Sequence, residues 1–211
     1  MKYKAFVFDL DGVLVFTDQL HYKAWKKLAN KLQIEFDDEI NNRLRGVGRM
    51  ESLDIILEKS TRKFSMQEKE ELAEEKNNTY VSLISSMNEK DVSDDVRNTL
   101  VELKRKGFKL AIGSSSKNAK LILNQTKLID YFDVISDGTN IQESKPNPEV
   151  FLKAAEYLDI DAKDCFAVDD ANAGIDAANA AGMCSVGIGE AASYNRCSRS
   201  ISTFSDLLYL V

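Results

Sequence analysis

Residues 3–13 read YKAFVFDLDGV, a short apolar run that ends in two aspartates and a glycine. The run from Tyr3 to Phe8 has apolar side chains on both faces, which is typical of a strand buried on both sides of a parallel sheet. Asp9 and Asp11 are two residues apart, so at the end of a strand their side chains would point the same way. Gly12 then permits a tight turn. This stretch predicts a sheet whose carboxyl edge presents a pair of carboxylates.

Strand-like and helix-like patterns alternate along most of the chain. Apolar, partly β-branched runs are bounded by turn or cap residues, and helical spacing of apolar residues lies between them. This alternation predicts an α/β fold with a Rossmann-like, doubly wound parallel sheet and right-handed crossovers. The predicted strands cover residues 3–8, 108–112, 132–136, 164–168 and 183–188, and helical spacing covers 96–104, 121–123 and 150–158.

Residues 17–87 break this alternation. Leucine and alanine recur at helical spacing over residues 20–32, and the charged stretch 65–85 is helical throughout. Because this block directly follows the first strand, it should project above the carboxyl edge of the sheet, where open α/β sheets bind ligands. We therefore expect a Rossmann-like catalytic core formed by residues 1–16 and 88–211, with an inserted α-helical cap domain at 17–87.

The composition excludes several classes of protein. The chain has 211 residues, 44% of them hydrophobic, and a formal net charge of -6, which argues against a nucleic-acid binder. No apolar run approaches the ~20 residues that a membrane span needs. Cys165, Cys184 and Cys197 lack Cys-x-x-Cys spacing, so we expect reduced thiols in a cytoplasmic protein. His21 is the single histidine, which excludes a histidine-based metal cluster.

The acidic turn has two readings. Two carboxylates as close as Asp9 and Asp11 would raise each other's pKa unless a cation is present. A hard, oxygen-binding ion such as Mg²⁺ would resolve that conflict and would also neutralise phosphate charge. The alternative is a solvated Asx turn, and the turn alone does not decide between the two.

Three further segments follow later strands and reach the same edge. Residues 113–118, GSSSKN, offer hydroxyl and amide groups at a helix start, which suit a phosphate, although Ser116 could equally be an ordinary helix cap. Lys145, within ESKP at 143–146, places a cation before a helix. A second acidic pair, in VDD at 168–170, ends a later strand. Together with the first turn, these segments predict a phosphoryl-transfer site.

The four motifs, in this order, resemble those of the haloacid dehalogenase superfamily over essentially the whole chain. The insertion is similar to the α-helical cap of the subgroup that contains the β-phosphoglucomutases. That closer resemblance is carried by residues 17–26, 45–52, 76–80 and 114–118.

The resemblance implies roles for the core residues. Asp9 would attack phosphorus and become an aspartyl phosphate, and Asp11 would act as general acid and base. Ser114 and Lys145 would hold the oxygens of the transferring phosphoryl group. The implied ligands of Mg²⁺ are Asp9, Asp11 through its backbone carbonyl, and Asp170, with Asp169 close by.

The resemblance also implies a sugar phosphate held between cap and core. Arg49 would bind the non-transferring phosphate. His21 would couple cap closure to the placement of Asp11, and Trp25 would either contact the sugar or pack within the cap. The implied substrate-binding residues are Thr17, His21, Trp25, Gly46, Arg49, Ser52, Lys76, Ser116, Lys117 and Asn118.

Two positions depart from the family pattern. Phe16 stands where the family commonly has aspartate, so the start of the cap would rely on Thr17 or Asp18 as the helix cap. Asp169 stands where the mutases usually carry glutamate, and its shorter side chain would reach Mg²⁺ through water.

The resemblance implies interconversion of β-glucose 1-phosphate and glucose 6-phosphate through a bisphosphate. An alternative is a hydrolase of a small sugar phosphate, which would share the same core. A third is a non-enzymatic binding module, but such a protein should have lost Asp9, Asp11, Lys145 or the second acidic pair. Because a cap must open and close, we expect a monomer whose partner is a small molecule.

Overall fold

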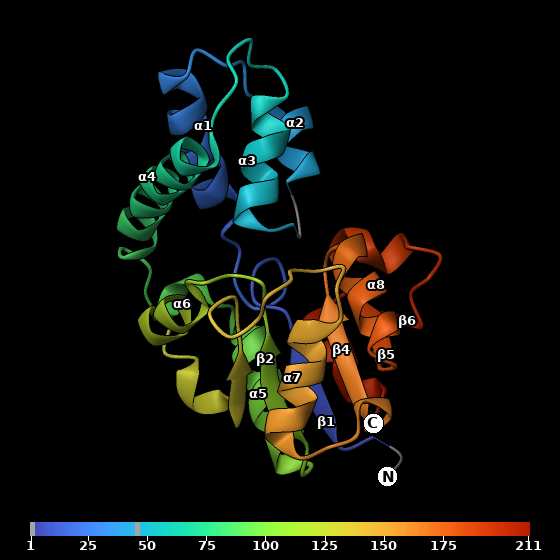
Figure 1. Cartoon of the computed structure of the whole chain (residues 1–211). Coiled ribbons are helices and arrows are strands. Elements are labelled where there is room, and N and C mark those ends of the chain that lie inside the picture. The colour runs from blue at the N-terminus through green and yellow to red at the C-terminus, as the bar shows by residue number, and fades with distance from the viewer. Residues whose placement is uncertain (1–2, 45–46) are drawn as a thin grey trace.

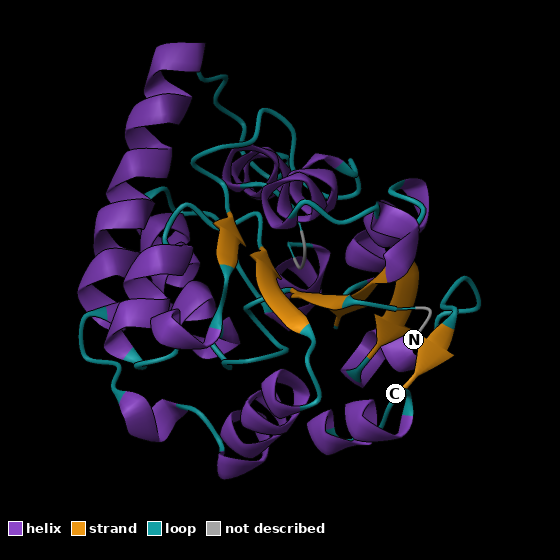
Figure 2. Cartoon of the chain, turned by 90° about the horizontal axis from the view of Figure 1, so that it is seen from below, coloured by secondary structure: helices purple, strands orange, loops and turns teal. Residues whose placement is uncertain are grey.

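Six parallel strands form the central sheet, in the order β3-β2-β1-β4-β5-β6. The computed structural model describes residues 3–44 and 47–211. Helices lie on both sides of the row of strands (Figure 2), which confirms the predicted doubly wound α/β fold. The strands are β1 (Ala5–Phe8), β2 (Lys109–Gly113), β3 (Val134–Ser136), β4 (Cys165–Asp169), β5 (Cys184–Gly187) and β6 (Arg199–Ser200).

The helices follow the predicted order, and some of them begin at a side-chain cap. The Ser65 hydroxyl accepts a hydrogen bond from the Glu68 backbone N–H at 3.2 Å, and the Glu68 carboxylate accepts one from the Ser65 N–H at 2.8 Å, a complete capping box. The helices are α1 (Asp18–Lys31), α2 (Asp38–Arg43), α3 (Arg49–Leu57), α4 (Met66–Ile84), α5 (Asp94–Arg105), α6 (Ala119–Gln125), α7 (Glu149–Leu158) and α8 (Asn172–Ala180). Short 3₁₀ segments are η1 (Glu89–Asp91), η2 (Ile129–Tyr131), η3 (Ala162–Asp164), η4 (Gly189–Ser193) and η5 (Phe204–Tyr209).

Alternating side chains of β1 supply both faces of the sheet. Phe6 and Phe8 belong to the larger hydrophobic cluster, which also contains residues of α5, α6 and η5. Ala5 and Val7 belong to the opposite cluster, which also contains residues of α7 and α8. Every side chain of the strand is therefore buried, as the continuous apolar run predicts.

The four helices α1–α4 stand together beyond the carboxyl ends of the strands, at the opposite end of the molecule from the C-terminus (Figure 1). They enclose a hydrophobic cluster of their own, which includes Trp25, Leu53 and Ile56. The end of α4 differs, because Tyr80 and Ile84 pack in the larger cluster of the sheet. We propose that residues 17–87 form a cap that α4 anchors to the core.

The strand order places the site. The chain runs from β1 outward to β2 and β3, then returns to the other side of β1 for β4, β5 and β6. At such a switch point the loops after neighbouring strands diverge and leave a crevice at the carboxyl edge. The segments that follow β1, β2 and β4 therefore border one crevice, which lies beneath α1–α4.

One strand was missed by the sequence analysis. The edge strand β6 is two residues long, and both its residues are polar and exposed. It therefore carries no apolar signal, and only its pairing with β5 reveals it. Within residues 3–44 and 47–211, no helix is long and apolar enough to cross a bilayer.

Candidate active site

A cavity of about 260 Å³ lies between the carboxyl ends of the strands and the helices α1–α4. Residues from both sides line it, as the position of the predicted cap requires. The predicted site residues among them are Asp9, Asp11, His21, Trp25, Arg49, Ser52, Lys76, Ser114, Ser116, Lys117, Asn118, Lys145, Asp169 and Asp170. The predicted Gly46 lies outside the described residues.

The turn after β1 brings two acidic segments together. The Asp9 backbone N–H donates a hydrogen bond to the Val168 carbonyl at 2.9 Å, which fixes the end of β1 against β4. Gly12 follows with a φ of +82°, and a Cβ there would lie 2.1 Å from the Asp170 carboxylate. Glycine is therefore required at position 12 both for the left-handed backbone and for the close approach of Asp170.

Asp11 lines the same cavity as Asp9, and it lies in the turn that follows β1. Because β1 ends at Phe8, the turn and not strand alternation positions the Asp11 side chain, and a ligand shared by Asp9 and Asp11 stays a prediction. Tight-turn hydrogen bonds over residues 10–15 redirect the chain, and the Thr17 hydroxyl donates to the Asp11 carboxylate. Burial raises the pKa of Asp11, although the hydrogen bond from Thr17 opposes that shift.

Thr17, a predicted substrate-binding residue, lies beside Asp11. It is fully buried, and the cavity is lined without it. Thr17 stands at the start of α1, yet its side chain makes no cap hydrogen bond. Its hydroxyl is engaged with Asp11 instead, so Thr17 links the first cap helix to the predicted general acid.

Lys145 is the buried cation at the centre of the core site. Its ammonium donates to Asp9 at 2.6 Å and to Asp169 at 2.8 Å. Burial alone would lower the pKa of Lys145, but the charges of Asp169 and Asp9 and the hydrogen bonds to them raise it above its ordinary value. Burial also raises the pKa of Asp9 well above its usual range, an effect that Lys145 opposes and Asp169 reinforces. The site is thus short of positive charge for its carboxylates.

Three of these carboxylates fit a metal ion. Asp9, Asp169 and Asp170 each offer one oxygen, and the three oxygens lie within 4.8 Å of one another. All three are hard anionic donors, which suit Mg²⁺, and the missing Cβ of Gly12 leaves room for Asp170 beside them. Asp169 has other partners as well, because it binds Lys145 and accepts a hydrogen bond from the Ala171 N–H at 3.0 Å. Its predicted water-mediated contact with the ion stays a prediction.

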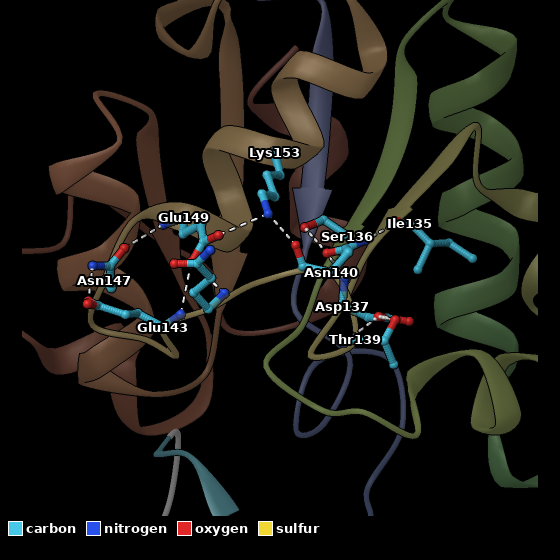
Figure 3. A network of polar contacts seen from close by, with 10 residues as sticks. Ile135, Ser136, Asp137, Thr139, Asn140, Glu143, Asn147, Glu149 and Lys153 are labelled. Atoms are coloured by element: carbon cyan, nitrogen blue, oxygen red, sulfur yellow. Dashed lines mark hydrogen bonds and ion pairs between the residues drawn. The ribbon is translucent and has the colours of Figure 1, made fainter.

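The loop that carries Lys145 is fixed by the start of α7 (Figure 3). The Glu149 carboxylate accepts hydrogen bonds from the backbone N–H groups of Gln142 and Glu143 at 2.8 and 2.9 Å, and pairs with Lys153 at 2.9 Å. Lys153 also donates to the Asn140 carbonyl. The backbone hydrogen bond from Glu143, the bond from Lys153 and that from Gln142 lower the pKa of Glu149 to about 2. The Glu149 carboxylate, which holds this loop, therefore stays charged at physiological pH.

Lys76 of α4 lines the cavity on the side of the helices α1–α4. Its ammonium lies 4.6 Å from the centre of the Trp25 ring and 4.7 Å from that of Tyr80, and 3.0 Å from His21 Nδ1. Burial and the nearby Arg49 lower the pKa of Lys76 to about 7. Burial, Lys76 and Arg49 also hold the pKa of His21 well below its usual value, so the neutral ring can accept from the ammonium. Trp25 both packs within the cap and lines the cavity.

The far side of the cavity is the boundary between cap and core. Side-chain hydroxyls of the loop after β2 accept hydrogen bonds from the backbone of the same loop. The Ser114 hydroxyl accepts one from the Ser116 N–H and the Ser116 hydroxyl accepts one from the Asn118 N–H, both at 3.2 Å. Asn77 of α4 accepts hydrogen bonds from Arg49 and from Asn118. Asn77 was not among the predicted site residues, although it directly follows Lys76.

The comparison with known proteins now bears on these features. The model of the haloacid dehalogenase-like hydrolases matches residues 3–182. The chain belongs to this family. It is 42% identical over 189 residues to the β-phosphoglucomutase of Bacillus subtilis (strain 168), which covers 89% of this chain and 84% of that protein. A crystal structure of β-phosphoglucomutase from Clostridium difficile matches 99% of this chain and 95% of its own, with 41% identity and a TM-score of 0.92.

Another relative of this chain carries a different name. The phosphorylated carbohydrates phosphatase of Thermotoga maritima is 30% identical over 183 residues, covering 85% of this chain and 82% of that protein. The chain is thus related both to a mutase and to a phosphatase. Family membership supports phosphoryl transfer, and the acceptor of the phosphoryl group has to be argued from the site.

Buried Lys76 predicts a pH-dependent cost in stability. Its folded-state pKa of about 7 lies below the ordinary 10.5, so between these values the unfolded chain binds more protons and the free energy of unfolding rises with pH. We expect Lys76→Met to be more stable than the wild type at pH 6 and to lose substrate binding. The stability difference should shrink by up to about 1.4 kcal/mol per pH unit above pH 7.

Urea unfolding of both proteins between pH 6 and pH 9 measures this difference. Lys69→Met, at a half-buried position of the same helix where the lysine pairs with Asp54, serves as the control, and its difference from the wild type should not follow this trend. If the difference in the free energy of unfolding between Lys76→Met and the wild type stays constant with pH, burial does not disfavour the charged form of Lys76.

Proposed function

We propose that this protein is a β-phosphoglucomutase, which interconverts β-D-glucose 1-phosphate and β-D-glucose 6-phosphate. The reaction would proceed through an aspartyl phosphate and glucose 1,6-bisphosphate. The observation that carries the proposal is a single cavity with anion-binding groups at two places. Lys145 and Ser114 lie at the strand ends, whereas Arg49 and Asn118 meet at the boundary of cap and core.

Two such places favour a mutase over a simple phosphatase. A bisphosphate intermediate needs one site for the phosphoryl group that reacts and another for the phosphate that does not. A phosphatase needs only the first of these. The identity of 42% with a β-phosphoglucomutase, spread over 89% of the chain, supports the same choice.

The core residues divide the transfer into two steps. Asp9 attacks phosphorus, the bond from phosphorus to the sugar oxygen breaks, and Asp11 gives that oxygen its proton. In the second step a hydroxyl of the sugar phosphate attacks the aspartyl phosphate, returns its proton to Asp11 and frees Asp9. Lys145 and Ser114 hold the oxygens of the moving phosphoryl group.

Thr17 gives Asp11 a connection to the cap. Because the Thr17 hydroxyl at the start of α1 binds the Asp11 carboxylate, movement of α1 would move the general acid as well. Closure of the cap would also exclude water from the cavity, which protects the aspartyl phosphate from hydrolysis. A hydroxyl of the sugar phosphate is then the available acceptor of the phosphoryl group.

Mg²⁺ would be held by Asp9, Asp170 and the Asp11 backbone carbonyl, with Asp169 beside it. When bound, the ion supplies positive charge that offsets both the carboxylates and the phosphoryl oxygens. The protein residues position the substrate and transfer the protons.

The fate of phosphate tests the proposal. The purified protein is incubated with β-glucose 1-phosphate, Mg²⁺ and a trace of β-glucose 1,6-bisphosphate, and glucose 6-phosphate and inorganic phosphate are both quantified. We expect glucose 6-phosphate in large excess, and neither product after the metal is removed with EDTA until Mg²⁺ is restored. Inorganic phosphate equal to the substrate consumed, without glucose 6-phosphate, would favour the sugar-phosphate phosphatase instead.

A further inference from the structure

Asn77 connects the cap to the core through a single oxygen. Its Oδ1 accepts a hydrogen bond from Arg49 Nη2 at 2.8 Å and another from Asn118 Nδ2 at 3.0 Å. Arg49 is the first residue of α3, Asn77 lies on α4, and Asn118 belongs to the core loop before α6. Three separate elements thus meet at one acceptor.

A second close approach lies near this bridge. Gly48, which precedes α3, comes so near the core loop that a Cβ would lie 3.0 Å from the Ser144 hydroxyl. The backbone of the cap at Gly48 therefore contacts the core beside the Asn77 bridge. The bridge therefore joins two parts that are in contact.

Arg49 and Asn118 keep further N–H groups that could bind a ligand while both donate to Asn77. A guanidinium has five N–H groups, and that of Arg49 uses one on Asn77 while another faces Glu74 at 3.7 Å. The Asn118 amide has a second N–H beyond the one given to Asn77. Since both side chains line the cavity, an anionic group could accept from both without breaking the bridge.

We propose that Asn77 is the positioning residue that assembles the site for the non-reacting phosphate when the cap closes. It holds Arg49 and Asn118 at one point before any ligand arrives, so a phosphate finds both donors already ordered. Such preorganisation lowers the conformational cost of binding. The ligand part of this inference rests on the proposed function, whereas the bridge itself does not.

Two substitutions of Asn77 test two changes separately: the loss of the acceptor and the addition of a negative charge. Asn77→Leu has a similar size but no acceptor, so it should free both donors. Asn77→Asp keeps an acceptor for both donors but adds a negative charge beside the phosphate. The control is Asn78→Leu, because Asn78 is the exposed neighbour on the same helix.

The first measurement needs no ligand. The side-chain amide signals of Asn118, assigned by their loss in Asn118→Asp, are followed in ¹H–¹⁵N spectra. We expect them to shift in Asn77→Leu, to remain near their wild-type positions in Asn78→Leu, and to be largely retained in Asn77→Asp. Unchanged Asn118 signals in Asn77→Leu would overturn the bridge.

The second measurement is the affinity for glucose 6-phosphate, by calorimetry with Mg²⁺ present. We expect Asn77→Leu to weaken binding about tenfold or more, as expected for lost charge-assisted hydrogen bonds, with the urea midpoint unchanged. Asn77→Asp should bind weakly too, and increasingly so at low salt, because its charge repels the phosphate. Equal affinity of Asn77→Leu and the wild type would overturn the positioning role. If the wild type itself does not bind glucose 6-phosphate, the proposed function fails, and the ligand-free signals still judge the bridge.

Discussion

Asp9→Asn should reduce turnover by at least about 10⁴-fold, since it removes the nucleophile on which both steps depend. The amide is nearly the same size as the carboxylate, so the fold should survive. Lys145 would lose one of its two anionic partners but keep Asp169 at 2.8 Å. The measurements are the steady-state rate with β-glucose 1-phosphate and the incorporation of phosphate from acetyl phosphate, which should vanish.

A matched exchange at the surface controls for charge. Asp130→Asn changes an exposed carboxylate that is not part of the cavity lining and should keep the wild-type rate. Substantial turnover in Asp9→Asn, or labelling of that variant by acetyl phosphate, would refute the assignment of Asp9 as the nucleophile.

Asp11→Asn should lower the mutase rate by about 10² to 10⁴-fold, the usual contribution of a general acid and base. An amide cannot protonate the departing sugar oxygen or take a proton from the attacking hydroxyl. Acetyl phosphate has a good leaving group that needs no such proton. We therefore expect Asp11→Asn to be labelled at Asp9 by acetyl phosphate, while the labelled protein fails to transfer to glucose 6-phosphate.

The comparison of the two donors identifies the role of Asp11. Equal losses with acetyl phosphate and with the sugar bisphosphate would indicate that Asp11 supports the structure or the metal instead of moving a proton. Thr17→Val gives a second view, because it keeps the carboxylate but removes the hydroxyl that binds it. We expect a smaller loss in Thr17→Val than in Asp11→Asn.

The sequence predicted the parts of the site that follow from strand order. Asp9, Ser114 and Asp170 each follow a buried strand, and parallel strands bring their carboxyl ends to one edge. No measured distance is needed for that inference. The insertion after β1 likewise predicted a helical layer above the same edge, and the structure has it there.

The parts that were missed depend on contacts that spacing does not encode. Hydrogen bonds within a six-residue turn, not strand alternation, position Asp11 after β1, and its carboxylate binds Thr17. The pairing of Lys145 with Asp169 joins residues 24 apart in sequence through the buried interior. Asn77 owes its position to Arg49 and Asn118, which belong to other elements. Motifs locate such residues near a site, but packing decides what they touch.

The central claim is that the phosphoryl group on Asp9 passes to a sugar and not to water. The most direct measurement follows a radiolabelled phosphoenzyme, formed from labelled β-glucose 1,6-bisphosphate, after rapid mixing with excess glucose 6-phosphate and Mg²⁺. We predict that the label appears in glucose 1,6-bisphosphate within the turnover time and that little becomes inorganic phosphate. Label released as inorganic phosphate at the same rate with and without glucose 6-phosphate would contradict the account.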